Sequence, residues 1–278
     1  MIDSRPSETQ AFGTSENDEP LVRLDLASAV ARLSMNRPQA RNALSVELCG
    51  AITEAVTETE RTPSARVLVL RGEGKVFCAG ADYAAISGPG GLDFLPAFER
   101  MLETVSRCRV PVVAAIQGAA LGGGLQLAVA CDFRVVAADT KLGIPSARLG
   151  IVVNFENVQR LVFLVGPALA REMLMAARTF DGATAEDAGL VNRSVVPEEL
   201  DAAVEEFASK IAELAPLSVQ GAKKTIQAVV DHLSGARTSQ PEATAEIDRL
   251  VVEAYNSKDL AEGLAALSAK KNPDFKGH

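Results

Sequence analysis

Apolar and polar residues follow one another along the chain in a pattern that predicts strands separated by helices. The apolar positions of residues 21–33 predict a β-hairpin, and Ser45 is a candidate N-cap for a helix that runs to about Glu60. Residues 67–70 are consecutive aliphatic residues, which is typical of a short buried strand. Strands of this kind in alternation with helices predict an α/β fold.

The alternation continues through the middle of the chain. We expect a helix over residues 92–107, a strand over 111–116, a buried helix over 125–130 and a strand over 133–136. From about residue 158 onward the pattern is mostly helical, with prolines marking the breaks between helices.

Composition divides the chain into three regions. Residues 1–19 contain five acidic residues, one arginine and few apolar residues, which predicts a disordered tail. Residues 20–198 form the predicted α/β core, and residues 199–278 form a predicted helical C-terminal region.

Charge and cysteine usage exclude several classes of function. The formal net charge is -8 and the pI is about 5.0, so the chain lacks the basic surface that nucleic-acid binding needs. Four cysteines without a CxxC pair, together with only two histidines, disfavour a metal site and a Ser-His-Asp triad. Unpaired cysteines and the lack of a signal peptide at the N-terminus favour a cytoplasmic protein.

One uncharged stretch, residues 110–131, is long enough to cross a bilayer. Pro111 opens it, three consecutive glycines at 122–124 interrupt it, and Gln117 and Gln126 place amides within it. A strand, a glycine turn and a buried helix fit this pattern better than a membrane span does.

Two glycine-containing turns are the candidate chemical features. They cover residues 77–82 and 117–124, and each follows a predicted strand. Small residues let the backbone approach a ligand, and two N–H groups directed at one point can stabilise a developing negative charge. The alternative is that both are tight turns needed only for packing. The second turn matches neither GxxxxGK[ST] nor GxGxxG, so a nucleoside triphosphate or dinucleotide site is poorly supported.

Five segments, in chain order, resemble the crotonase superfamily, typified by enoyl-CoA hydratases and isomerases. The segments are MNRPQARNALS at 35–45, GKVFCAGAD at 74–82, AALGGG at 119–124, AEDAGLVN at 185–192 and the ending at 262–275. The resemblance implies a spiral of ββα units and a helical C-terminal region that assembles a homotrimer or a dimer of trimers. It also implies an acyl-CoA thioester as ligand, with no cofactor beyond the coenzyme A moiety of the substrate and no metal.

The resemblance also implies roles for individual residues. The N–H groups of Ala81 and Gly123 would form an oxyanion hole for the thioester carbonyl. The residues that would line the coenzyme A arm are Ala40, Arg41, Ala79, Asp82 and Tyr83. Lys270, Lys271 and Phe275 would contact the nucleotide from the C-terminal tail, unless these basic residues only face solvent.

The acid–base residues depart from the family pattern. Gln126 and Ser146 stand where a family hydratase has its two glutamates. An amide does not titrate, and a hydroxyl has a pKa far from neutrality, although general acid–base catalysis commonly contributes about 10²–10⁴-fold. Ordinary hydration is therefore disfavoured. Glu156 is a replacement candidate; alternatively, it complements the dipole at the start of a helix.

Other titrating residues have simpler interpretations. Asp82 is expected to hold its loop, Cys78 to be a small buried thiol and His232 to lie on a helix surface. Tyr83 would shape the acyl pocket or donate a hydrogen bond.

The leading hypothesis is an enoyl-CoA hydratase/isomerase-like enzyme that stabilises a thioester enolate, with isomerisation favoured over hydration because it needs one proton shuttle. A second hypothesis is a non-catalytic acyl-CoA-binding protein, which would keep the two turns and lack the acid–base pair. A purely structural oligomer is less favoured, because it would need neither turn.

Overall fold

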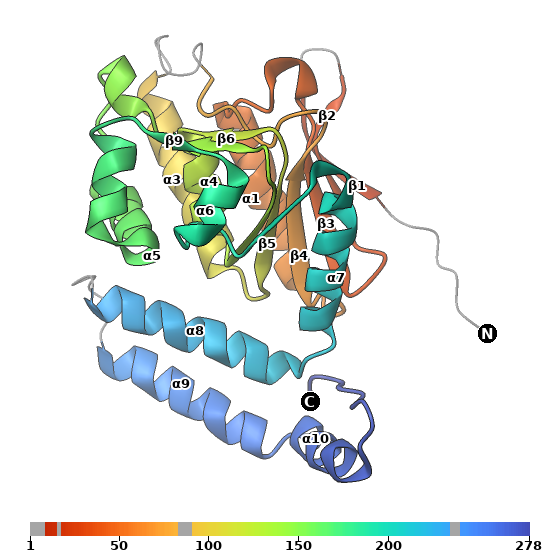
Figure 1. Cartoon of the computed structure of the whole chain (residues 1–278). Helices are drawn as coiled ribbons and strands as arrows, with labels where there is room; N and C mark the ends of the chain where they lie inside the picture. The colour runs from red at the N-terminus through yellow and green to blue at the C-terminus, as the bar shows by residue number, and fades with distance from the viewer. Residues whose placement is uncertain (1–8, 16–17, 83–90, 234–239) are drawn as a thin grey trace.

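The computed structural model describes residues 9–15, 18–82, 91–233 and 240–278, and the chain forms two sheets surrounded by helices (Figure 1). In spatial order the strands of the main sheet are β1 (Thr9–Thr14), β2 (Pro20–Asp25), β3 (Val30–Met35), β4 (Val67–Gly72), β5 (Val112–Ile116), β7 (Phe133–Ala137) and β10 (Arg193–Val195). The second sheet contains β6 (Ala119–Leu121), β8 (Lys141–Gly143) and β9 (Thr179–Phe180).

The helices follow the strands in chain order. They are α1 (Val46–Arg61), α3 (Gly91–Arg107), α4 (Gly123–Ala130), α5 (Phe155–Leu174), α6 (Gly182–Asp187), α7 (Leu200–Ala212), α8 (Pro216–Leu233), α9 (Gln240–Tyr255) and α10 (Lys258–Ala269). The predicted hairpin is β2 and β3, which pair in antiparallel fashion. The predicted helices and strands between Ser45 and residue 136 are all present.

Local sequence explains why α1 begins and packs where it does. The hydroxyl of Ser45 accepts a hydrogen bond from the N–H of Leu48 at 3.2 Å, as an N-cap does. Leu48, Ile52 and Val56 follow at helical spacing and are fully buried. This confirms the predicted N-cap and directs the apolar face of α1 toward the sheet.

The main sheet is buried on both faces. Along β4, Leu68 and Leu70 belong to the large apolar cluster that includes residues of α1, α3 and α4. Val67 and Val69 point to the other face, where they pack in a second cluster with residues of α7. Burial on both faces explains why this strand is a continuous apolar run.

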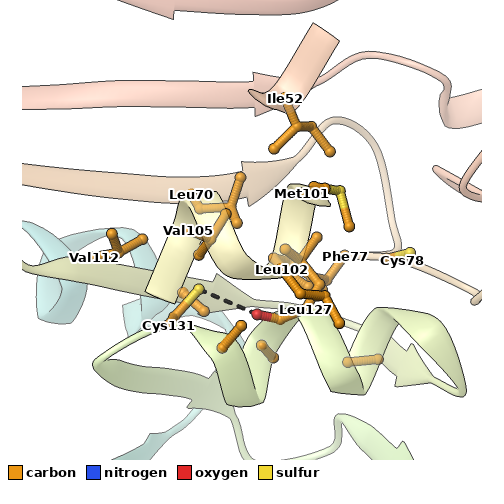
Figure 2. Packing of buried hydrophobic residues seen from close by; sticks show 14 of the residues in the cluster. Ile52, Leu70, Phe77, Cys78, Met101, Leu102, Val105, Val112, Leu127 and Cys131 are labelled. Carbon is orange, nitrogen blue, oxygen red and sulfur yellow. Dashed lines mark hydrogen bonds between the residues drawn. The ribbon is translucent and has the colours of Figure 1, made fainter. Parts of the chain in front are cut away.

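Figure 2 shows the core between the sheet and the helices. Phe77 and Leu102 pack together there, and both are fully buried. The thiol of Cys131 lies at 3.4 Å from the carbonyl oxygen of Leu127. The segment that leads into the first glycine turn is therefore anchored in the core by Phe77.

The chain winds as a spiral in which a long strand, a short strand and a helix repeat. Strands β5 and β6 precede α4, and β7 and β8 precede α5. Two single bridges, Cys78 with Ala120 and Leu44 with Ala81, extend the second sheet backward to the earlier turns of the spiral. This arrangement confirms the expected spiral of ββα units and places the two glycine turns on adjacent repeats.

The N-terminal region differs from the prediction of a disordered tail over residues 1–19. Thr9–Thr14 forms β1, which pairs antiparallel with β2 at the edge of the main sheet. Phe12 packs against the large apolar cluster, and β2 offers unpaired backbone groups at the edge of the sheet. These two contacts order a segment that is polar in sequence.

The boundary predicted at residue 198 also differs from the structure. Helix α7 packs on the second face of the main sheet through Leu200, Val204 and Ala208. The α/β body therefore continues to the end of α7 at Ala212, and the separate helical region begins with α8.

Helices α8, α9 and α10 lie together beside the body (Figure 1). Within the described residues, neither apolar cluster of the body contains a residue from these helices. Polar contacts connect them to it, such as the 2.6 Å ion pair between Lys223 and Asp132. Many of their apolar side chains are exposed: Ile226, Val229, Leu233, Val251, Val252, Tyr255, Leu260, Leu264 and Leu267. No described helix has the length and apolar content needed to cross a membrane.

Candidate functional site

The two glycine turns lie directly against each other. Cys78 N donates to Ala119 O at 3.1 Å, and Leu121 N donates to Cys78 O at 3.1 Å. A Cβ atom placed on Gly80 would lie 2.8 Å from Leu121 O and 3.6 Å from Gly123 N. Gly80 also has a φ of +109°, so the approach of the two backbones depends on a glycine there.

The second turn leads directly into α4. Gly122, with φ at +54°, is the N-cap residue, and its N–H donates to Gly143 O at 2.9 Å. A Cβ on Gly124 would lie 2.4 Å from Cys78 O, so the start of α4 packs on the backbone of the first turn. The positive end of the helix dipole therefore faces the gap between the turns.

Two backbone donors remain available at this junction. Among the residues that the structure describes, neither Ala81 N nor Gly123 N has a hydrogen-bond acceptor. Both residues are half-buried. Gly123 is the first residue of α4, so its N–H has no acceptor within the helix, and a ligand or water can supply the acceptor for both donors.

Gln126 and Ser146 lie on segments that begin at the same junction. Gln126 lies one turn into α4, where its N–H donates to Gly122 O at 3.1 Å. Ser146 begins the short 3-10 helix that follows β8, close in sequence to Gly143, the residue bonded to Gly122. Both side chains are half-buried, and in the described part of the chain neither forms a side-chain hydrogen bond. They are therefore free to bind a water molecule or a polar group of a ligand.

Glu156 lies elsewhere. It is exposed in the first turn of α5, and it lines a cavity of about 320 Å³ with Glu99, Arg107, Arg160 and other residues of α3, α5 and α8. Neither Ala81 nor Gly123 lines this cavity. The carboxylate has the position that an interaction with the helix dipole requires, and the structure does not bring it together with the turns.

Four of the residues expected to line a coenzyme A arm gather around the first turn. Ala79 N donates to Arg41 O at 3.0 Å, and Ala40 precedes Arg41 in the same loop. Asp82 accepts a hydrogen bond from Arg37 at 3.1 Å, as expected for a residue that holds its loop. Tyr83 lies outside the described residues.

The C-terminal candidates are distant from the turns. Lys270 and Lys271 directly follow α10, which lies at the opposite end of the molecule from β6 (Figure 1). Arg66 donates to Phe275 O at 2.6 Å, which holds the C-terminal tail beside the residue that precedes β4. Within one chain, therefore, Lys270, Lys271 and Phe275 are not brought together with the glycine turns.

Cysteine and histidine have the simple roles expected of them. Cys78 is fully buried, and burial raises the pKa of its thiol to about 12, so it is not a nucleophile at neutral pH. His232 is exposed on α8. No group of three or more metal-ligating side chains was found within the described residues.

Two polar residues that support the first turn, Arg37 and Asn42, could not be recognised from the sequence. Asn42 is fully buried, and its side-chain amide donates to Glu73 O at 3.0 Å and to Val76 O at 2.7 Å. The guanidinium of Arg37 donates hydrogen bonds to Ala43 O and to Asp82 Oδ2. Both residues stand in the segment 35–45 that resembles the crotonase superfamily, but a local pattern does not reveal to which distant carbonyl a polar side chain will donate a hydrogen bond.

Comparison with known proteins agrees with this fold. A protein described as an enoyl-CoA hydratase/carnithine racemase from Magnetospirillum magneticum has a similar structure, with a TM-score of 0.85, 33% identity and coverage of 96% of this chain and 98% of that one. The enoyl-CoA hydratase of Bacillus anthracis matches with a TM-score of 0.82 and 32% identity, over 93% of this chain and 100% of that chain. The architecture is thus that of the crotonase-fold proteins.

Sequence comparison identifies the family. The crotonyl-CoA hydratase of Syntrophomonas wolfei is 34% identical over 265 residues, which cover 91% of this chain and 97% of that protein. A probable enoyl-CoA hydratase of Bacillus subtilis is 33% identical over 262 residues, 92% of this chain and 98% of that protein. Residues 25–278 match the enoyl-CoA hydratase/isomerase family, and the chain belongs to it.

Proposed function

We propose that the protein binds an acyl-CoA thioester and that the N–H groups of Ala81 and Gly123 form the oxyanion hole for its carbonyl. The observation that supports this most strongly is the pair of backbone donors at the junction of the two turns, which have no acceptor among the described residues. Two such donors stabilise the negative charge that develops on a thioester oxygen when an enolate forms. The coenzyme A arm would lie along Ala40, Arg41, Ala79 and Asp82, with no metal or further cofactor.

The acid–base residues favour isomerisation over hydration. Hydration of an enoyl thioester requires both activation of a water and delivery of a proton, whereas a double-bond shift needs one group that moves a proton. Gln126 and Ser146 can hold a water but cannot act as general acid or base near neutral pH. Glu156 is the carboxylate that we propose to test as proton shuttle, although it lies in a separate cavity.

A non-catalytic acyl-CoA-binding protein is the second candidate. It is favoured by the same replacement of both glutamates, because binding needs the two donors and not the acid–base pair. The matches to named hydratases favour the enzyme.

The assembly and location are part of the same proposal. The exposed apolar side chains of α8, α9 and α10 support a homotrimer or a dimer of trimers, in which a neighbouring copy would cover them. The four free, buried cysteines support a reducing compartment, the cytoplasm.

The test is to incubate the protein with a panel of 2-enoyl and 3-enoyl CoA thioesters of short, medium and long chain. Chromatography then separates the isomeric products, and mass spectrometry detects any gain of water. We expect a double-bond shift without gain of water. Retention of a thioester without change would favour the non-catalytic candidate. Rapid gain of water would contradict the inference from Gln126 and Ser146, and failure to bind any thioester would contradict the proposal itself.

Gly123 offers a matched pair of control variants for this panel. Gly123 is the first residue of α4, where proline is tolerated, so Gly123→Pro removes the N–H donor and places the ring Cδ where its hydrogen was. Gly123→Ala adds a Cβ 3.3 Å from the side chains of Leu44 and Phe98 but keeps the donor. We expect the proline variant to lose about 10²–10³-fold in turnover and the alanine variant to lose much less.

A further inference from the structure

The orientation of the Ala81 N–H is set by a bridge to Leu44. Leu44 N donates to Gly80 O, and Asp82 N donates to Leu44 O, each at 2.8 Å. Successive residues of an extended segment direct their backbone groups to opposite sides. The groups of Gly80 and Asp82 face Leu44, so the N–H of Ala81 points away from it. A shift of Leu44 relative to this segment would turn the Ala81 donor.

Arg37 holds the two sides of this bridge together. Its guanidinium donates from Nη1 to Ala43 O at 2.7 Å and from Nη2 to Asp82 Oδ2 at 3.1 Å. Ala43 directly precedes Leu44, and Asp82 directly follows Ala81. The side chains of Arg37 and Asp82 are 20% and 23% exposed, so water screens their ion pair less than it screens a surface pair. One rigid group thus links the residues that flank the bridge.

Asn42 fixes Arg37 in turn. Its side-chain oxygen accepts the backbone N–H of Arg37 at 2.9 Å, while its amide donates to Glu73 O and Val76 O. Asn42 is fully buried and has a φ of +53°, a conformation that asparagine tolerates better than most residues. The backbone that carries Arg37 is therefore tied to the loop that leads into the first turn.

We propose that Arg37 is a positioning residue for the oxyanion hole. Its guanidinium keeps the Leu44–Ala81 bridge in register and thereby aims the Ala81 N–H at the ligand carbonyl, without bonding that carbonyl itself. This inference rests on the proposed function, because it concerns the donor geometry of the same site.

The test is the absorption of hexadienoyl-CoA, whose conjugated thioester absorbs at longer wavelength when its carbonyl is polarised. Wild-type protein is expected to shift the band of the bound thioester to the red. In Arg37→Met we expect the shift to fall by about half and kcat, where turnover occurs, to fall by about 10-fold, less than the loss on deletion of a donor. Both readouts are taken at saturating thioester, because Arg37 also pairs with Asp82, which would line the coenzyme A arm, so the variant is expected to bind free coenzyme A more weakly as well.

Two further variants make the result specific. Arg37→Lys keeps the charge but loses the fork that reaches two acceptors, so it should give an intermediate shift. Arg32→Met breaks the 2.6 Å ion pair with Glu205 on α7, on the other face of the sheet, and should leave the band of the bound thioester unchanged. If Arg37→Met does not fold, Arg37→Lys replaces it in the same comparison.

The possible results separate this inference from the proposed function. A full red shift and unchanged kcat in the Arg37 variants, with normal wild-type behaviour, would overturn the positioning role. If the wild type binds hexadienoyl-CoA without any red shift, the oxyanion hole itself is refuted, and with it the basis for a role of Arg37.

Discussion

Replacing both Gln126 and Ser146 by glutamate is expected to raise the rate of crotonyl-CoA hydration by about 10²- to 10⁴-fold, the usual contribution of general acid–base catalysis. These residues closely follow Gly122 and Gly143, which are hydrogen-bonded to each other at the junction of the two turns, and their side chains are half-buried without side-chain hydrogen bonds in the described structure. Two new carboxylates at this place would repel each other, which raises the pKa of one and lets it act as the acid. Loss of absorbance of the enoyl thioester measures the rate.

The single variants and a charge control test whether position matters. Gln126→Glu and Ser146→Glu alone should each recover only a small part of the activity, because groups that act as a pair are strongly non-additive. Gln10→Glu with Ser64→Glu adds the same charge on β1 and on the loop after α1, and should have no effect. A double glutamate variant that folds, binds crotonyl-CoA and remains inactive would show that these positions do not face the acyl group.

Gly124→Ala is expected to damage both stability and function. A methyl group there would lie 2.4 Å from Cys78 O and 2.8 Å from Cys78 Cβ, so the backbone of one turn must move. Overpacking of this kind commonly costs about 1–3 kcal/mol of unfolding free energy, measured by urea titration. Because the displaced segments carry Ala81 and Gly123, turnover should fall by about 10²-fold, as on loss of an oxyanion donor.

A second helical glycine provides the control for this variant. Nothing lies within 4 Å of a Cβ placed on Gly50 in α1. Gly50→Ala should therefore stabilise the protein by about 0.5–1 kcal/mol through helix propensity and leave turnover unchanged. Equal stability and activity of Gly124→Ala and the wild type would mean that the close packing of the two turns is not required.

Much of the fold could be predicted from the sequence because its signals are local. Ser45 as N-cap, the apolar stripe of α1 and the continuous aliphatic run of β4 each depend on neighbouring residues, and each prediction was confirmed. The two glycine turns could be found for the same reason, since Gly80 and Gly122 mark conformations that other residues rarely adopt.

Features that depend on distant contacts could not be predicted. Strand β1 is polar in sequence and becomes ordered only because β2 offers an edge. Helix α7 was predicted to belong to the C-terminal region, but Leu200 and Val204 pack in one cluster with buried residues of β3, β4, β5 and β7, strands that lie more than sixty residues earlier in the chain. The hydrogen bonds that Arg37 and Asn42 donate could not be predicted either, because their acceptors, Asp82 and Val76, lie in a loop whose path the sequence does not show.

The most direct test of the account is infrared difference spectroscopy of a bound acyl-CoA labelled with ¹³C at the thioester carbonyl. If Ala81 and Gly123 both donate to the carbonyl oxygen, the labelled stretch moves to lower frequency on binding. The shift should be retained in Gly123→Ala and strongly reduced in Gly123→Pro, which lacks one donor. A carbonyl frequency that is unchanged on binding, or equal in these two variants, would contradict the assignment of the oxyanion hole.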